Sequence, residues 1–342
     1  MKSMRTEIAV LLAVAPTVMS AIDRKPLGEI DFFGYRGLDL AAVRSALPFH
    51  EGDLFPPAKA KSSESLKRQV HQTVEQVIGR PPTDVSFVCC DSKQNWIVYI
   101  GLPGESYEPL TFNPAPTRAL RFPKAALALR EEMDKAWMNA MMNGHATEDD
   151  SEGYALSNDP KARRAQLSIR EYALRNEPLI LQVLASSSDA RHRALAAQML
   201  GYARQSGEQV DALVRASLDR DQNVRNDAVR ALEVLAGAKP DLAKRIPPEP
   251  FVRLLRSGAW SDHNKASLLL LALTKSRDPK LLMLLRSDAL DSLVEMARWR
   301  SAGHADAALA ILGRIAGLSE DSLNQLIEDG QADTIISQLN RQ

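Results

Sequence analysis

The sequence predicts a mostly α-helical fold, in which an α-solenoid of repeated helix pairs follows a small N-terminal α+β domain. Aromatic residues make up only 5% of the chain while Ala and Leu are abundant, which favours helix-on-helix packing over a large sheet. After Asp159 a helix-pair pattern recurs at intervals of 32 to 40 residues, which is typical of stacked repeats. Residues 22–102 instead have the pattern strand, helix, helix, strand, strand.

The first residues contain the three parts of a secretory signal. The basic residues Lys2 and Arg5 precede a short apolar run over 8–15, and small residues over 18–21 suit cleavage. A bilayer-spanning helix needs about 20 apolar residues, so this run is too short, and no later segment is long and apolar enough. We therefore predict a signal peptide over 1–21 and export to the periplasm or outside the cell. A membrane-tethered or ordinary N-terminus is the alternative.

The segment 22–102 alternates between strand and helix periodicity. Asp39 is placed to cap a short helix, and Leu66, Val70 and Val74 form the apolar stripe of a longer one. Two runs with alternating apolar residues follow, joined by a polar turn that is typical of a hairpin. The expected strands cover 29–35, 85–91 and 96–101, and the expected helices begin at Asp39 and at Ser62 or Ser63.

This element order resembles the POTRA fold, which forms periplasmic modules in outer-membrane assembly and secretion proteins. The resemblance covers 22–102 and also rests on three short sequence motifs, at 34–39, at Leu47-Pro48 and at Glu51-Gly52-Asp53. It implies an interaction module that accepts a partner strand at an open sheet edge. If the sheet order is first, third, second strand, the edge is 85–91, and the candidate partner-binding residues are Val85, Phe87 and Cys89. The alternative is a small folding domain that packs against the solenoid and whose edge is covered.

The two cysteines, Cys89 and Cys90, are adjacent in the sequence. An exported chain could oxidise them, but neighbouring cysteines lie outside the usual disulfide geometry, and strand alternation would place them on opposite sheet faces. We therefore expect one buried thiol and one near the surface. A metal site would need more ligands than this pair supplies.

Residues 103–116 are too rich in proline for a helix and are interpreted as a linker between domains. Over 117–158 we expect an amphipathic helix and an acidic loop. The helix follows Pro123, with Ala126, Met133 and Trp137 on one face. The loop residues 148–152 lack the ligand spacing of a calcium loop, so we expect a solvated loop.

Residues 159–342 contain the repeats. The clearest unit runs over 213–232, where an apolar helix ends in an acidic turn and a second helix opens with Val224-Arg225. The turn Asp221-x-x-Val224-Arg225 and the small residues after it resemble HEAT repeats. The resemblance covers 159–318 and implies stacking, because a single helix pair cannot bury its apolar face alone. Residues 322–342 are expected to form a C-terminal cap.

Three cations align near the start of successive second helices, namely Arg193, Arg225 and Lys265. Such a row could bind the carboxylates or phosphates of a partner. The interpretation that we favour is that each cation binds carbonyl groups or an acidic turn in the neighbouring repeat. Asn226 and Arg230 follow on the same helix and are the better candidates for an exposed, partner-binding surface.

No catalytic motif is recognisable, and no catalytic, cofactor-binding or metal-binding residue is predicted. His192 and His304 occupy equivalent repeat positions but are too far apart along the array to share a metal. We therefore predict that the chain is not an enzyme and has no cofactor. An accessory role related to the lyases that share HEAT-like repeats is an alternative.

The function we predict is a non-catalytic protein-protein interaction scaffold in the bacterial cell envelope, with a protein or peptide partner. Nucleic-acid binding is a second alternative, since some HEAT-like proteins bind DNA, but the 43 basic and 43 acidic residues balance each other and export also opposes it. The identity of the partner, the pathway and the oligomeric state do not follow from the sequence.

Overall fold

A computed structural model describes residues 25–55, 63–145 and 147–339, so the predicted signal peptide lies outside the described residues. The chain divides into two compact units. The first unit contains the described residues up to Leu110, then Arg253–His263 and the described residues from Pro279 onward. The second unit contains Thr111–Val252 and Asn264–Asp278, so the change of unit after Leu110 falls within the segment interpreted as a linker.

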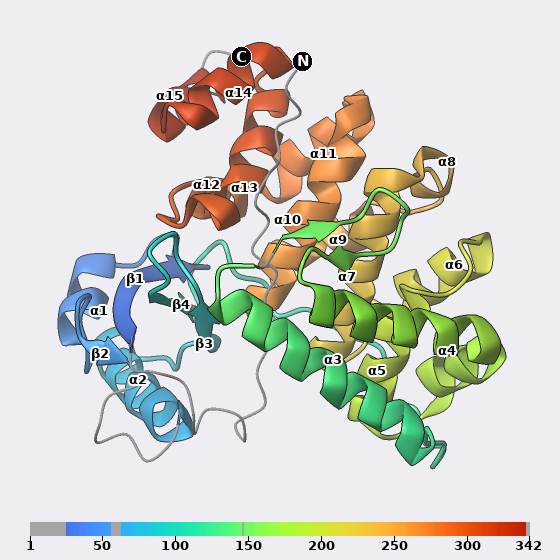
Figure 1. Ribbon diagram of the computed structural model, residues 1–342. Coiled ribbons are helices and arrows are strands. Elements are labelled where there is room, and N and C mark those ends of the chain that lie inside the picture. The colour runs from blue at the N-terminus through green and yellow to red at the C-terminus, as the bar shows by residue number, and fades with distance from the viewer. Residues whose placement is uncertain (1–24, 56–62, 146, 340–342) are drawn as a thin grey trace. The chain divides into compact units, whose positions relative to one another are not determined.

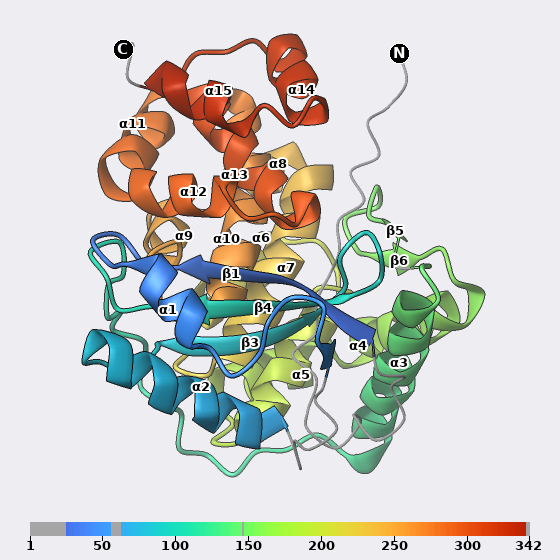
Figure 2. The same ribbon diagram turned by 90° about the vertical axis from the view of Figure 1, so that its left-hand side faces the viewer.

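The first unit contains a four-stranded sheet of order β2-β1-β4-β3, and Figure 2 shows β1, β4 and β3 side by side. Strand β1 is parallel to β4, which is antiparallel to β3. The short β2, which was not predicted, pairs with the start of β1. The sheet therefore has the order first, third, second strand on which the proposed edge depended, and β3 lies at the edge. The strands are β1 (Lys25–Phe33), β2 (Leu54–Phe55), β3 (Asp84–Cys89) and β4 (Trp96–Gly101).

Helices α1 (Leu40–Ala46) and α2 (Ser63–Ile78) pack on one face of this sheet (Figure 2). Asp39 caps α1 by accepting hydrogen bonds from the Ala41 and Ala42 N–H groups, as predicted. The guanidinium of Arg44 on α1 lies 5.0 Å from the centre of the Phe32 ring, and Lys67 Nζ on α2 lies 5.9 Å from that of Phe87. The predicted stripe of α2 is buried at Leu66, Val70 and Val74.

The other sheet face packs against helices from the C-terminal part of the chain. Tyr99 on β4 is hydrogen-bonded through its hydroxyl to His304 Nδ1 at 2.7 Å, and its ring stacks on that of Trp260 at 5.1 Å. Trp299 Nε1 donates to the Phe32 carbonyl at 2.9 Å. Because both faces are covered, all six residues of β4 are buried. The residues that make these contacts belong to the same compact unit as the sheet.

A buried carboxylate fixes the loop that follows β1. Glu295 accepts hydrogen bonds from the N–H groups of Gly34 at 2.7 Å, Tyr35 at 3.1 Å and Arg36 at 2.9 Å, and from Ser106 Oγ at 2.6 Å. Gly34 has a φ of +70°, and a Cβ there would lie 2.4 Å from the Leu102 carbonyl oxygen, so the loop requires glycine. Burial raises the pKa of Glu295 to about 7, while the four hydrogen bonds act in the opposite direction.

The repeats of the second unit are stacked helix pairs, so the solenoid prediction is confirmed (Figure 1). Helix α5 packs against both α4 and α7, and α6 packs against α7. The acidic turns of the sequence pattern are helix caps, because Asp159, Asp189 and Asp221 each accept N–H groups at the start of the following helix. The helices are α4 (Pro160–Ser186), α5 (Ala190–Leu200), α6 (Gly207–Ala216), α7 (Gln222–Ala238), α8 (Pro240–Ala243), α9 (Glu249–Leu254) and α10 (Trp260–Leu273).

The C-terminal helices belong to the first unit. The predicted cap is a helix pair, α14 (Glu320–Glu328) and α15 (Ala332–Gln338), and both helices pack on α13 (Ala302–Ile315). Leu323 and Ile335 are the buried anchors of the two cap helices. The preceding helices are α11 (Pro279–Asp288) and α12 (Leu290–Ala297), and α12 carries Glu295.

Residues 111–122, which we call the strap, run in an irregular conformation along the repeats of the second unit. Isolated bridges join Asn113 to Asp219 and Arg118 to Ser187. The predicted amphipathic helix follows as α3 (Lys124–Met142). The acidic segment then forms a hairpin of β5 (Glu148–Asp149) and β6 (Leu156–Ser157), so the expectation of a solvated loop was wrong for Glu148, which is half-buried and pairs with Arg230.

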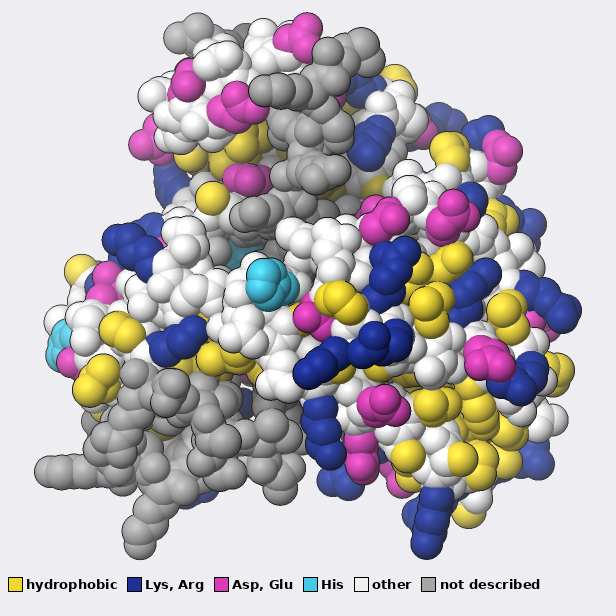
Figure 3. Space-filling model, viewed as in Figure 1, with side chains coloured by type: hydrophobic (Ala, Val, Ile, Leu, Met, Phe, Trp, Pro, Cys, Tyr) yellow, Lys and Arg dark blue, Asp and Glu magenta, His cyan; other side chains and the backbone are white. Residues whose placement is uncertain are grey.

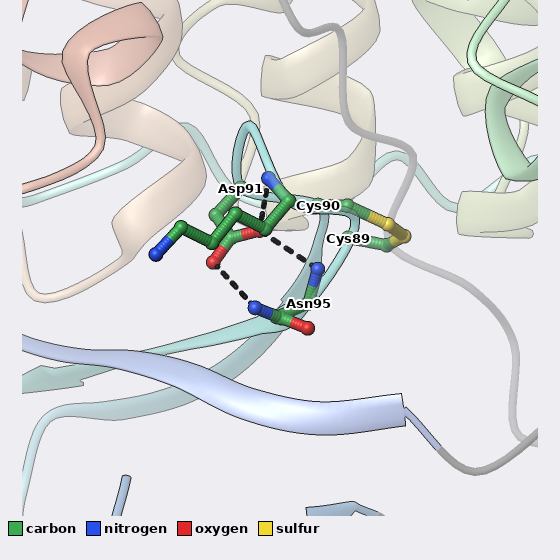
Figure 4. Close-up of a disulfide and its surroundings, with 5 residues drawn as sticks. Cys89, Cys90, Asp91 and Asn95 are labelled. Carbon is green, nitrogen blue, oxygen red and sulfur yellow. Dashed lines mark hydrogen bonds between the residues drawn. A yellow bond between two sulfur atoms is a disulfide. The ribbon is translucent and has the colours of Figure 1, made fainter. Parts of the chain in front are cut away.

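Cys89 is buried and Cys90 is half-buried, as expected, but the expectation that both are thiols was wrong, because a disulfide joins them at the end of β3 (Figure 4). The peptide bond between them is cis, and their Cα atoms lie 3.0 Å apart. Asp91 then closes the turn to β4 by accepting from the N–H groups of Lys93 and Asn95. Within the described residues, no helix is long and apolar enough to cross a membrane.

Candidate protein-binding surfaces

Arg193 on α5 binds the neighbouring repeat. Its side chain is 1% exposed, and Nε and Nη2 donate to the two carboxylate oxygens of Asp219 at 2.7 and 2.8 Å. Nη1 donates to the Ser187 carbonyl at 2.8 Å. Asp219 belongs to the turn before α7, so the favoured interpretation, in which the cation binds the acidic turn of the next repeat, is confirmed for this residue.

Arg225 on α7 binds the turn that precedes its own helix. Nη1 donates to the carbonyls of Asp219 at 2.9 Å and Arg220 at 3.1 Å. Its guanidinium carbon lies 3.9 Å from the centre of the Phe112 ring of the strap, a cation–π arrangement. The strap therefore covers Arg225, which was a candidate partner-binding residue.

The expectation that Asn226 and Arg230 are exposed was wrong. Arg230 pairs with Glu233 at 2.9 Å and with Glu148 of β5, while Asn226 donates to Asp227 at 3.1 Å. Arg130 on α3 adds an ion pair to Asp227 at 3.2 Å. Glu148 and Arg130 come from segments distant in the sequence, so the periodicity of α7 alone gives no sign of these contacts.

Lys265 on α10 is 1% exposed, and its Nζ makes no hydrogen bond to any residue that the structure describes. The charges of Arg230, Glu233, Glu148 and Asp227 act on it. Burial lowers the pKa of Lys265 to about 7, with Arg230 acting in the same direction and the carboxylates opposing it. Arg193, Arg225 and Lys265 therefore line the interior of the second unit.

We expect Lys265→Met to raise the free energy of unfolding by about 1–4 kcal/mol at pH 7, since an unpaired buried ammonium is replaced by a packed side chain. Because the folded pKa of about 7 lies below the ordinary value of 10.5, the unfolded chain binds the extra proton between these values. The wild type therefore gains stability as pH rises from 7 to 10.5, and the advantage of the variant shrinks over that range.

Urea unfolding of both proteins from pH 6 to pH 10 measures this difference. Lys161→Met provides the control, because Lys161 is exposed on α4. If Lys265→Met does not stabilise the protein at pH 7, or if its stabilising effect grows toward pH 10, then Lys265 is not a buried, unpaired ammonium with a lowered pKa.

Strand β3 presents its main chain rather than its side chains. Val85 and Cys89 are buried, and Phe87 packs against Phe55 with ring centres 5.0 Å apart, on the face covered by α1 and α2. On the opposite face, Asp84 accepts a hydrogen bond from the Trp260 N–H at 2.9 Å. In the described sheet β4 is the only neighbour of β3, so a strand added there would pair through the backbone.

Charged side chains of both signs are interspersed over the face seen in Figure 3, which has no broad region of one sign. Among the residues that the structure describes, no group of three or more His, Cys, Asp or Glu is placed to hold a metal ion.

Known proteins resemble this chain only distantly. No protein-family model and no curated protein sequence matches the chain. It is similar to a designed armadillo repeat protein in complex with the peptide (KR)4, at 16% identity and a TM-score of 0.36, over 53% of this chain and 87% of that one. A computationally designed armadillo repeat protein for modular peptide recognition matches at 16% identity and a TM-score of 0.37, over 54% and 88%. Similarity at this level does not identify a shared function.

Proposed function

We propose that this protein is a non-catalytic interaction scaffold of the bacterial cell envelope that binds a protein partner by strand addition at β3. The observation that carries the proposal is the edge position of β3 in the described sheet. An added strand gains main-chain hydrogen bonds there, and no buried charge has to be exposed. The POTRA-like order of 22–102 supports this mode of binding.

The internal contacts of the three candidate arginines also support β3 as the binding element. Arg193, Arg225 and Arg230 are engaged by carboxylates and carbonyls of their own chain. A partner at these positions would have to displace those groups, and a desolvated ion pair is costly to break. The edge strand requires no such displacement.

Site-specific photo-crosslinking in cells that contain the natural partner tests the proposal. A benzophenone amino acid placed at Ser86, a half-buried residue of β3, is expected to give a crosslink of defined mass, because an added strand would lie beside it. The same amino acid at Glu75, an exposed residue of α2, is the matched control and is expected to give none.

Crosslinks of equal strength from positions 86 and 75 would contradict strand addition, as would the absence of a crosslink from position 86. Recovery of the protein from the periplasmic fraction, shortened by residues 1–21, is the outcome that the envelope assignment expects.

A further inference from the structure

The strap makes main-chain contacts with equivalent positions of two successive repeats. The Asn113 N–H donates to the Leu218 carbonyl at 2.8 Å, and the Arg118 N–H donates to the Ser186 carbonyl at 3.2 Å. The Ser188 N–H returns a hydrogen bond to the Arg118 carbonyl at 2.7 Å. The repeats therefore present a regular set of main-chain groups to an irregular segment, and these contacts do not depend on its side chains.

Three side chains of the repeats complete the surface under the strap. Ser187 Oγ donates to the Leu120 carbonyl at 2.6 Å, and His192 Nδ1 accepts from the Phe122 N–H at 2.9 Å. Arg225 supplies the cationic face for the Phe112 ring. We call this surface the ridge, and it consists of Ser186, Ser187, Ser188, His192, Leu218 and Arg225.

The strap is loosely held for a segment inside a folded unit. From 111 to 121 no side chain is buried, and Phe122 is the first that is. Pro114 and Pro116 have no N–H group to contribute. Hydrogen bonds near solvent exchange readily with water, so a segment that depends on them opens at lower cost than the buried helices beneath it.

We infer that the ridge is a second binding surface, covered by the strap in this structure, which accepts an extended peptide in trans. A peptide that fits the ridge has the chemistry of the strap. It has an aromatic residue that packs on Arg225, followed by Asn and Pro, and a second free N–H group five residues after the Asn. This inference goes beyond the proposed function, because the ridge and β3 are different surfaces and either can fail alone.

The strap and a free peptide compete for the same groups. A tethered segment has a high effective concentration, so it reduces the apparent affinity of the ridge for a free peptide. Weakening the strap in the protein therefore strengthens binding of the peptide. Phe112→Ala does this, since it removes the cation–π contact of the strap and leaves every ridge residue in place.

The test is fluorescence polarisation with a labelled peptide of the sequence 109–123, added to full-length protein. The Phe112→Ala protein is expected to bind the peptide about 10-fold more tightly than the wild type. A peptide N-methylated at Asn113 and Arg118 is expected to lose about 10-fold or more, because it cannot donate to Leu218 and Ser186. The matched control is methylated at Thr111 and Thr117, which donate no backbone hydrogen bond among the contacts of the strap described here.

Saturable binding that depends on the amides of Asn113 and Arg118 supports the inference. No binding to either protein at millimolar peptide, or equal binding of the two methylated peptides, overturns it. Hydrogen exchange of the wild-type chain gives a measurement that does not depend on the folding of a variant. The amides of Asn113 and Arg118 are expected to exchange faster than the central amides of α7, and equal protection would show a fixed strap.

Discussion

Replacing Arg193 with methionine is expected to lower the stability of the second unit by about 3 kcal/mol or more. The substitution removes two hydrogen bonds to Asp219 and one to the Ser187 carbonyl. It leaves the Asp219 carboxylate, which is buried between repeats, without its cation. The loss is large because an unpaired buried charge costs more than the pair contributed.

Urea unfolding followed by circular dichroism measures this loss, since the second unit is mostly helical. Arg191→Met is the matched control, because Arg191 lies on the same helix but is exposed. Its effect is expected to stay within about 0.5 kcal/mol. A similar loss from both substitutions would show that position 193 has no special role in joining the repeats.

Replacing Glu295 with alanine is expected to release the loop after β1 and to destabilise the first unit by about 3 kcal/mol. The N–H groups of Gly34, Tyr35 and Arg36 lose their acceptor, and so does Ser106 Oγ. Water has little access to replace it, because Glu295 is 4% exposed. Glu295→Gln keeps one oxygen acceptor and is expected to lose less.

Tryptophan fluorescence during urea unfolding, measured in a Trp137→Phe background, reports on this unit, because the other three tryptophans belong to it. Asp291→Ala is the control. Asp291 is an acid on the same helix that also pairs with Arg36, but its side chain is 48% exposed, so its loss is expected to cost less than about 1 kcal/mol. Equal effects at 295 and 291 would rule out the buried carboxylate as the anchor of the loop.

The parts of the fold that the sequence predicts are those set by local or repeated chemistry. Asp39 and Asp221 cap helices through bonds to residues two or three positions away, which a short pattern reveals. The edge position of β3 follows from strand order. The pairing of Arg193 with Asp219 is predictable because the repeat places the next acidic turn at a known spacing.

The parts that the sequence does not predict depend on contacts between distant segments. Glu148 lies 82 residues before Arg230 along the chain, and no periodicity links a hairpin to a repeat helix. Glu295 lies 261 residues after Gly34. Asn226 and Arg230 have the polarity of a solvated helix face, but other segments cover that face. Charge alone does not distinguish a partner-binding surface from one that binds its own chain.

The central claim is that Arg193, the first residue of the cation row, joins two neighbouring repeats within the chain. A double-mutant cycle of Arg193→Met and Asp219→Asn measures that contact most directly, because it isolates the energy that the two side chains share. We predict a coupling energy of about 2 kcal/mol or more from the two charge-assisted hydrogen bonds. If the effects of the two substitutions on the free energy of unfolding are additive, the claim is wrong, and Arg193 is again a candidate for partner binding.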